Sequence, residues 1–181
     1  DVNQSLLCVG LEPDPKRFPK QFESNKHAIL DFCWDIVKST GDLVCAFKPQ
    51  IAYFASSGAE DQLKELIARI HGEYPEVPVI LDAKRGDIGS TAAAYAHHLS
   101  GVNAGERAFD PWHEDAVTVN PYLGTDGITP FVEAATGADK DIFVLVRTSN
   151  PSSSELQELE LASGERVYCL LYTSPSPRDM R

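Results

Sequence analysis

The stretch VPVILDAKRGDI, residues 77–88, decides the fold. Its first part, residues 77–81, is a short apolar run rich in Val and Ile, which is typical of a strand buried on both faces of a parallel sheet. Charged side chains follow at once, so the strand is expected to end where the charges begin. Enzymes built on α/β folds place their sites at the carboxyl ends of such strands.

The same pattern recurs along the chain. The other apolar runs are also short, and a polar residue follows each of them closely; they span residues 5–11, 43–47, 116–119 and 142–146. Segments with apolar residues at helical spacing lie between them, at residues 25–38, 57–71, 86–99 and 129–135. Alternating strands and helices predict an α/β fold with parallel strands.

The spacing of the strands indicates a particular α/β architecture. One strand follows the next about every 34 residues, so eight strand–helix units need about 270 residues, which is near the usual size of a (β/α)8 TIM barrel. The chain has 181 residues. We therefore predict a TIM barrel of which only about the first five βα units are present. Residues 1–168 are expected to form this partial barrel domain, and residues 169–181, which contain SPSP, a non-native or disordered tail.

Composition excludes several classes of partner. Lys and Arg number 16 against 27 Asp and Glu, a formal net charge of −11, whereas sequence-independent nucleic-acid binding needs a basic face. No apolar run approaches the roughly 18 residues of a spanning helix, so we expect no membrane partner.

Cys8 and Cys45 lie in apolar runs and are predicted to be small core residues. Without paired or metal-type cysteine spacing, a cytoplasmic setting is the default.

The charged residues after the central strand form a candidate site. Asp82 and Lys84 are two residues apart and so share one face of the strand, and Asp87 follows in the loop. Lys48 ends the preceding strand, whose end is adjacent in a barrel, so it is expected to meet Asp82 and Lys84. An alternating Lys–Asp–Lys–Asp array keeps every member charged. Such an array suits a reaction in which charge develops on a substrate atom, although an ordinary salt bridge at a barrel mouth is the alternative.

Longer motifs surround these residues in a characteristic order. They are LLCVGLEPDPKRFP, CAFKPQIAYF, PVILDAKRGDIGSTAAAYA, AVTVNPYLGTDGI and FVLVRTSNPSSSELQ, spread over residues 5–157. On these motifs the chain resembles the orotidine 5′-phosphate decarboxylases of the longer bacterial subgroup. The resemblance implies a homodimer of TIM barrels, without cofactor or metal, that converts the nucleotide orotidine monophosphate to UMP and CO2 in de novo pyrimidine biosynthesis.

The resemblance also implies roles for the charged array. Lys84 is the general acid that protonates C6 of the pyrimidine as CO2 leaves. Asp82 lies against the substrate carboxylate and disfavours it relative to the transition state. Lys48 orients Asp82 and contacts the ribose. Asp87 reaches into the site of the partner subunit.

Substrate-binding roles follow from the same resemblance. Ile88 packs near the base, and Thr91 contacts the ribose across the dimer. Ser149 hydrogen-bonds the amide edge of the pyrimidine, and Asn120 is a polar residue near the site at the end of the fourth strand. Glu12 stands where the family usually has an aspartate that binds ribose.

Two alternatives remain open from the sequence. One is a Mg²⁺-dependent sugar-phosphate decarboxylase of the same superfamily, in which Glu12 supplies an extra carboxylate. The other is an inactive fragment, because nothing in residues 169–181 matches the residues with which the family grips phosphate. We accordingly expect the chain as it stands to be poorly stable and nearly inactive. His97 and His98 are expected to face solvent, and the histidines to form no metal site.

Overall fold

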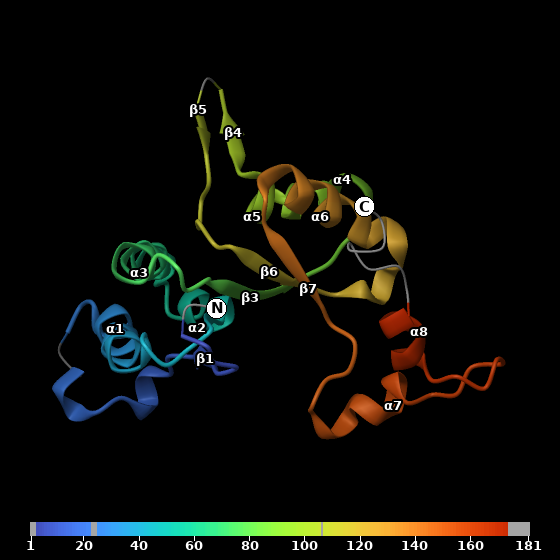
Figure 1. The fold of residues 1–181 in the computed structure, drawn as a ribbon, viewed down its shortest axis with the longest axis horizontal. Helices are drawn as coiled ribbons and strands as arrows, with labels where there is room; N and C mark the ends of the chain where they lie inside the picture. The colour runs from blue at the N-terminus through green and yellow to red at the C-terminus, as the bar shows by residue number, and fades with distance from the viewer. Residues whose placement is uncertain (1–2, 23–24, 106, 174–181) are drawn as a thin grey trace.

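The computed structural model describes residues 3–22, 25–105 and 107–173. Its parallel strands are β1 (Cys8–Leu11), β2 (Ala46–Pro49), β3 (Ile80–Arg85), β6 (Ala116–Val119) and β7 (Asp141–Val144). β1 pairs with β2, and β3, β6 and β7 form a second parallel ladder. Single parallel bridges, Phe47–Val79 and Gln50–Asp82, join β2 to β3. The strands therefore follow one another in sequence order, as the barrel prediction requires (Figure 1).

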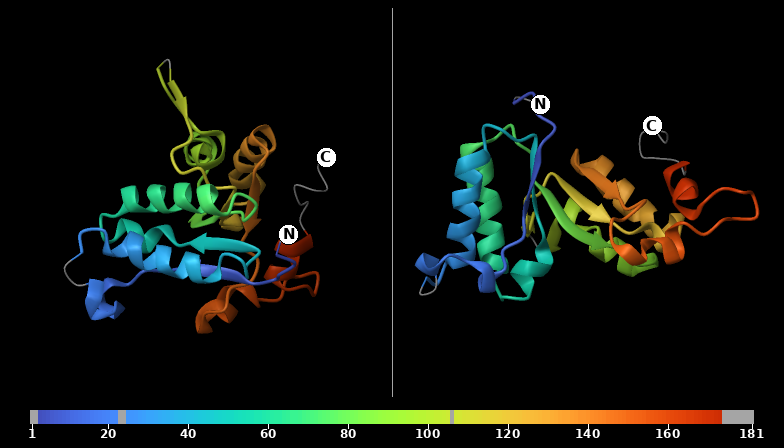
Figure 2. Two further views of the ribbon diagram at one scale, coloured as in Figure 1. Left: turned by 60° about the vertical axis from the view of Figure 1, so that its left-hand side comes forward. Right: turned by 90° about the horizontal axis from the view of Figure 1, so that it is seen from below.

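Helices connect the strands and cover them in two groups. They are α1 (Ala28–Thr40), α2 (Ile51–Ala55), α3 (Glu60–Glu73), α4 (Gly89–Tyr95), α5 (His97–Ser100) and α6 (Thr125–Ala138). Helices α1 and α3 pack side by side against β1 to β3, and α4 and α5 pack against α6 beside β6 and β7 (Figure 2). The apolar faces of these amphipathic helices thus meet the strands from outside.

The apolar core has two parts that correspond to the two helix groups. One is centred on Phe47, Phe54 and Leu66, between β1 to β3 and helices α1 to α3. The other is centred on Phe131 and lies between α4 to α6 and strands β6 and β7. Ala83 packs against both parts. The charged segment of β3 therefore lies where the two parts of the core meet.

Several short elements were not predicted from the sequence. Strands β4 (Val102–Ala104) and β5 (Arg107–Phe109) form an antiparallel hairpin that projects from the body (Figure 1). Helix α2 directly follows β2. The 3-10 turns are η1 (Pro15–Arg17), η2 (Lys20–Phe22), η3 (Pro121–Leu123) and η4 (Pro151–Ser153). Helices α7 (Ser154–Gln157) and α8 (Val167–Thr173) follow β7. The unpredicted helices and 3-10 turns have three to seven residues, fewer than two helical turns, and the two hairpin strands have three residues each.

Some predicted boundaries differ from the structure. β3 begins at Ile80, after Pro78, and continues to Arg85, so the charged residues lie in the strand itself rather than beyond it. The predicted helix 86–99 is divided at Ala96 into α4 and α5. The predicted helix 129–135 is longer and spans all of α6, with Pro130 inside it. The strand 116–119 coincides with β6.

The predictions for the cysteines and the tail had mixed outcomes. Cys8 is exposed and Cys45 is only partly buried, so both were wrongly predicted to be core residues. Cys8 lies on β1, which ends the strand order and has a neighbouring strand on one side only. The predicted tail begins inside α8, and residues 174–181 lie outside the described residues, so its non-native character stays a prediction. Among the described residues, no helix has the length and apolar character needed to cross a membrane.

Gly86 allows a close approach that positions the loop after β3. A Cβ at this residue would lie 2.8 Å from the carbonyl oxygen of Asn120. We expect Gly86→Ala to lower the free energy of unfolding by about 1–3 kcal/mol, because one of the two backbones must move. Gly72→Ala is the matched control, since no heavy atom lies within 4 Å of its Cβ; it should be neutral or stabilising by up to about 1 kcal/mol. Urea unfolding compares the two, and equal stabilities would contradict the close approach.

Candidate active site

The carboxylate of Asp82 is the centre of the candidate site. The residue is 5% exposed, and each of its oxygens accepts a pair of hydrogen bonds. Oδ1 accepts from Lys84 Nζ at 2.6 Å and from Thr118 Oγ1 at 2.8 Å. Oδ2 accepts from Lys48 Nζ and from Gln50 Nε2, both at 3.0 Å. A carboxylate has about four acceptor positions, so the described residues fill the hydrogen-bonding capacity of Asp82.

Three adjacent strands supply these donors. Lys48 lies in β2, and Gln50 follows β2 directly and pairs with Asp82 across the bridge to β3. Lys84 lies two residues beyond Asp82 on β3, and Thr118 lies on β6. Both lysines contact Asp82, as the alternation along β3 and the adjacency of parallel strand ends predict.

The surroundings of Asp82 keep it ionised. Burial alone would raise the pKa of its carboxyl group, but the hydrogen bonds from Lys84, Thr118 and Lys48 outweigh burial and hold the pKa below its ordinary value. The side chains of Lys48 and Lys84 are 32% and 45% exposed. The site therefore combines a fixed, buried anion with two ammonium groups that a ligand can reach.

The backbone of β3 is distorted at Lys84. Its φ of 49° lies in the left-handed region, which is unfavourable for a residue with a side chain, and the register of β3 against β6 shifts here. Thr118 Oγ1 accepts the N–H groups of Ala83 and Lys84 at 3.0 and 2.9 Å. The N–H of Asn120 donates to the carbonyl of Arg85 at 2.7 Å. Contacts from β6 thus hold the distorted segment on both sides of Lys84.

Among the described residues, the remaining residues predicted after β3 form no hydrogen bond or ion pair with Asp82. The carboxylate of Asp87 accepts the N–H of Ile88 at 2.8 Å. Within the described residues, no ion pair joins Asp87 to either lysine of the site, so one chain assembles three members of the predicted array and leaves the fourth outside. Ile88 and Thr91 are both exposed.

The other predicted binding residues follow the carboxyl ends of further strands. Glu12 is exposed directly after β1. Asn120 follows β6, and its side chain accepts the N–H of Tyr122 at 3.0 Å, which caps the turn η3. Ser149 is exposed in the loop after β7. They therefore lie beyond the carboxyl ends of parallel strands, although among the described residues none of them forms a hydrogen bond or ion pair with Asp82.

The loop that carries Ser149 is held by side chains of the loop and of the segment around α7. Gln157 Oε1 accepts the N–H of Thr148 at 2.8 Å, and its Nε2 donates to Thr148 Oγ1 at 2.8 Å. Arg147 donates to the carbonyl of Thr148 at 2.6 Å and pairs with Glu158. These contacts give the loop after β7 a defined conformation next to Ser149.

His98 differs from its prediction. It is 1% exposed, and its Nδ1 lies 3.0 Å from Oε1 of Glu114, which is also fully buried. Arg85 Nε donates to His98 Nε2 at 3.3 Å; because that nitrogen accepts, we assign the neutral tautomer that donates from Nδ1 to Glu114. The buried carboxylate of Glu114 gives the His98 ring a partner in place of the water that it loses on burial. The buried pair holds Arg85 on the outer side of β3, next to Lys84.

Two site residues were missed in the sequence. Gln50 lies two residues beyond Lys48, the spacing that joins Asp82 and Lys84, and this spacing was the available signal. Thr118 is the only hydroxyl in the apolar run AVTV, where a polar residue on a strand between apolar neighbours was a weaker signal. Among the described residues, no three His, Cys, Asp or Glu side chains are grouped so that they could hold a metal ion.

Comparison with known proteins agrees with this geometry. The model of the orotidine 5′-phosphate decarboxylase / HUMPS family matches residues 5–172. The chain belongs to this family. The orotidine 5′-phosphate decarboxylase of Aromatoleum aromaticum is 54% identical over 167 residues, which are 92% of this chain and 57% of the relative. That of Ralstonia pickettii is 55% identical over 166 residues, 92% of this chain and 56% of the relative.

Solved structures of the family share the fold. The OMP decarboxylase of Leishmania donovani superposes with a TM-score of 0.74 at 32% identity, over 94% of this chain and 59% of that protein. The UMP synthase of the same organism gives a TM-score of 0.77 at 34% identity, over 96% of this chain and 34% of that protein. The predicted partial TIM barrel is confirmed, and the chain spans little more than half the length of the curated relatives it matches.

The lowered pKa of Asp82 has a consequence for stability. In an unfolded chain the pKa of Asp is about 3.9, so the ionised carboxylate stabilises the fold above that pH and loses this contribution as the pH falls through the lower folded-state pKa. We expect the free energy of unfolding to fall below about pH 4, and we expect Asp82→Asn to make this decrease smaller. Urea unfolding at a series of pH values measures both.

The free energy of unfolding of Asp82→Asn should still decrease in acid, although by less than that of the wild type. Burial raises the pKa values of Asp110 and Asp115, but hydrogen bonds from Lys140 and His71 respectively outweigh it and hold both pKa values below the ordinary range. Both carboxylates therefore also lose stabilisation in acid. An identical pH dependence in the wild type and in Asp82→Asn would contradict the role given to Asp82.

Proposed function

We propose that this chain carries the reaction centre of an orotidine 5′-phosphate decarboxylase, which converts orotidine monophosphate to UMP and CO2 in de novo pyrimidine biosynthesis. The observation that carries the proposal is the buried carboxylate of Asp82, held between Lys48 and Lys84 at the carboxyl ends of adjacent strands. The names of the relatives, which are orotidine 5′-phosphate decarboxylases, support the choice of substrate.

The proposed reaction needs a proton at one carbon. When the bond between C6 of the pyrimidine and its carboxyl group breaks, CO2 leaves and the electron pair stays on C6. The ammonium group of Lys84 donates a proton to C6 and regains one from water, so the overall reaction consumes one proton. Nothing is oxidised or reduced, and the proton donor is a side chain of the protein. We therefore propose that the reaction uses neither a cofactor nor a metal.

Asp82 and Lys48 create the field in which this step occurs. The ionised Asp82 repels the substrate carboxylate, and this repulsion decreases as negative charge moves from the carboxylate to C6, near Lys84. The low pKa of Asp82 keeps its charge in place throughout. Lys48 donates a hydrogen bond to Oδ2 of Asp82, and in this proposal it orients the carboxylate and contacts the ribose.

The other predicted roles belong to the same proposal. Asp87 and Thr91 act in the site of the partner subunit of a homodimer, which fits the finding that no ion pair joins Asp87 to either lysine among the described residues of one chain. Ile88 packs against the base and Ser149 binds its amide edge. The binding residues nearest the ribose are Glu12 and Asn120. Exposure of Ile88, Thr91 and Ser149 leaves them accessible to a nucleotide or a second subunit.

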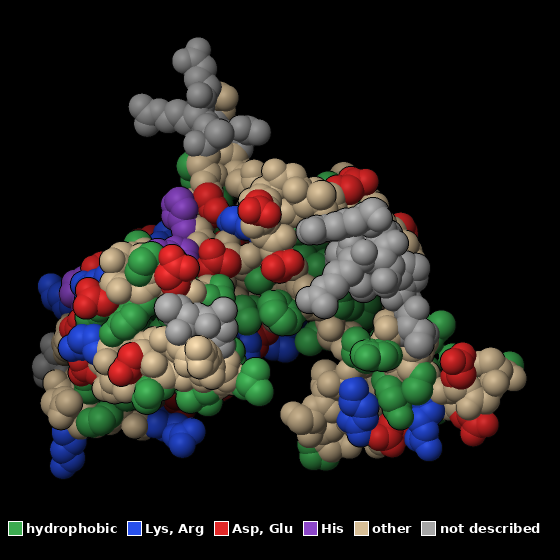
Figure 3. Space-filling view, viewed as in Figure 1, with side chains coloured by type: hydrophobic (Ala, Val, Ile, Leu, Met, Phe, Trp, Pro, Cys, Tyr) green, Lys and Arg blue, Asp and Glu red, His purple; other side chains and the backbone are tan. Residues whose placement is uncertain are grey.

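The predicted setting also stays within the proposal. Substrate and product are phosphorylated nucleotides, which do not cross membranes unaided, so we propose a cytoplasmic enzyme without nucleic-acid or membrane partners. The face shown in Figure 3 carries many acidic side chains, in keeping with the net charge of −11. A small phosphorylated substrate needs only local cations such as those of the site.

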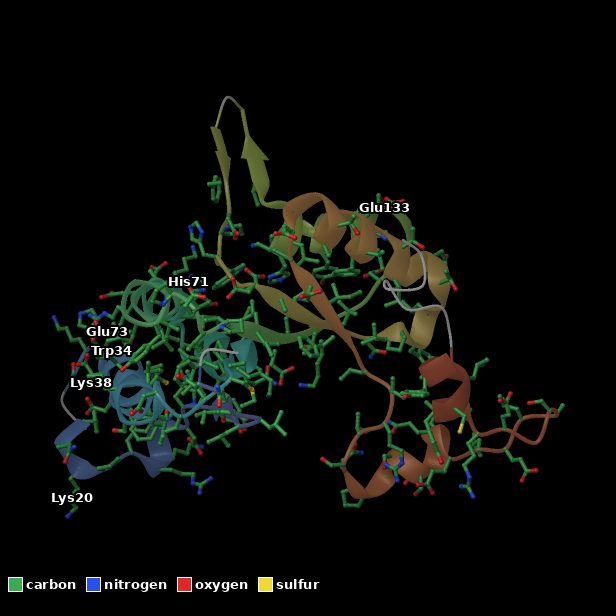
Figure 4. The ribbon with its side chains drawn as sticks, viewed as in Figure 1. Lys20, Trp34, Lys38, His71, Glu73 and Glu133 are labelled. Atoms are coloured by element: carbon green, nitrogen blue, oxygen red, sulfur yellow. The ribbon has the colours of Figure 1, made fainter. Side chains whose placement is uncertain are left out.

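Substitution of the proton donor tests the proposed function. With the chain in excess over orotidine monophosphate, UMP and CO2 are quantified in a single turnover. We expect Lys84→Ala to lower the rate at least about 100-fold, the usual effect of losing a general acid. Lys38→Ala is the control, because Lys38 lies on the outer side of α1 and its ion-pair partner among the described residues is the exposed Asp35 (Figure 4). This substitution should leave the rate unchanged. Equal rates in Lys84→Ala and the wild type would refute the assignment, and no product from the wild type would favour the inactive fragment.

Removal of divalent metal separates the decarboxylase from the alternative that uses Mg²⁺. We expect the rate in the same assay to change by less than about twofold when EDTA replaces Mg²⁺, because the charge at the centre comes from side chains. Mg²⁺-dependent decarboxylation of a sugar phosphate that carries a carboxylate, lost in Glu12→Gln, together with no turnover of orotidine monophosphate, would instead support the sugar-phosphate decarboxylase. The EDTA-treated chain is checked by circular dichroism, so that a loss of structure is not taken for a loss of metal.

A further inference from the structure

We propose that Thr118 is a positioning residue, whose hydroxyl group holds the distorted backbone at Lys84 and fixes the carboxylate of Asp82 against it. The catalytic consequence rests on the proposed function. The structural part does not, because it follows from hydrogen bonds that exist without substrate.

The hydroxyl of Thr118 uses its full bonding capacity. A hydroxyl has one hydrogen to donate and two lone pairs to accept. Thr118 Oγ1 donates to Asp82 Oδ1 at 2.8 Å and accepts from the N–H groups of Ala83 and Lys84 at 3.0 and 2.9 Å. The residue is 7% exposed, so these bonds form largely away from competing water. One side chain thus joins the buried anion to the backbone of the proposed proton donor.

The position of Thr118 on β6 explains why it reaches this segment. Its neighbours Val117 and Val119 are fully buried in the core under α4 to α6. Successive side chains on a strand point to opposite faces, so Thr118 points to the other face of β6, where Asp82 lies. An apolar residue would continue the core pattern of AVTV at this position but would leave Asp82 without one of its donors.

The distortion of β3 makes the acceptor necessary. The regular ladder between β3 and β6 is interrupted between Leu81 and Arg85. The N–H groups of Ala83 and Lys84 therefore need acceptors outside the ladder, and a buried N–H without one is costly. Thr118 Oγ1 replaces the missing ladder partners at the residue that carries the reactive ammonium group. Its branched Cβ restricts χ1, so the oxygen is itself held in place.

Isosteric substitution separates the hydroxyl from the shape of the side chain. Thr118→Val keeps the shape and removes the hydroxyl, whereas Thr118→Ser keeps the hydroxyl. In NMR experiments on the 181-residue chain, we expect Thr118→Val to speed amide exchange at Ala83 and Lys84 by roughly tenfold, and to raise the pKa of the Asp82 carboxyl group. Thr118→Ser should keep both properties close to those of the wild type.

Val117→Ala controls for general destabilisation. Val117 lies on the same strand as Thr118 but is buried in the part of the core under α4 to α6. Its substitution should therefore lower the melting temperature and leave the Asp82 titration unchanged. Exchange rates are compared relative to amides elsewhere in β3 and β6. If Thr118→Val fails to fold, Thr118→Cys keeps a weaker donor of similar size and should give smaller shifts in the same direction. The proposal would be overturned if Thr118→Val kept the slow amide exchange of the wild type at Ala83 and Lys84 and left the pKa of Asp82 unchanged.

Turnover distinguishes this inference from the proposed function. In the single-turnover assay, Thr118→Val should lower the rate at saturating chain concentration about tenfold or more, with little change in the half-saturating chain concentration. Thr118→Ser should stay within about threefold of the wild type. If the NMR effects appear but no form of the chain decarboxylates the nucleotide, the positioning role stands and the proposed function fails. If the wild type is active and Thr118→Val changes none of the exchange rates, the Asp82 titration and the turnover rate, the proposed function stands and the positioning role fails.

Discussion

A carboxylate with almost no access to water is the constraint on which the rest of the site depends. Asp82 can remain ionised only if protein donors replace the water that it loses on burial. Three neighbouring strands provide these donors, two from lysines and two from uncharged groups. The order β2, β3, β6 is therefore required by the site as well as by the fold. The chain spans little more than half the length of its relatives, yet it contains Asp82 together with all four of these donors.

The same constraint accounts for the irregular part of β3. In a regular strand the N–H of Lys84 would point away from β6, because Val79 and Arg85 bond to the β6 side and successive residues alternate. Instead its backbone enters the left-handed region, while Thr118 accepts the displaced N–H groups and Asn120 donates to the carbonyl of Arg85. Strain of this kind persists only where the surroundings determine it from several sides. Here the two parts of the core meet at Ala83, next to the distorted residue, and the buried His98 holds Arg85 from outside.

The sequence predicts the parts of this arrangement that depend on regular structure. Alternation on β3 placed Asp82 and Lys84 on one face, and the adjacency of parallel strand ends brought Lys48 to them. The left-handed backbone at Lys84 is not predictable in this way, because it depends on hydrogen bonds from a strand more than 30 residues away. Thr118 lies inside the apolar run AVTV, and that run predicts a core strand without indicating a site residue. His98 was wrongly predicted to face solvent, because its buried partner Glu114 lies 16 residues away in the sequence and helical periodicity does not reveal it.

The mixture of donors around Asp82 matters most when the proton moves. On the proposed mechanism Lys84 becomes neutral as C6 is protonated, and Asp82 then loses one of its two cationic partners. Lys48 still neutralises the carboxylate, and the uncharged Gln50 and Thr118 donate equally well before and after the transfer. Because these donors are fixed to β2 and β6, the carboxylate keeps its orientation while the charge next to it changes. Such a preorganised site avoids the reorganisation that water would undergo during the same step.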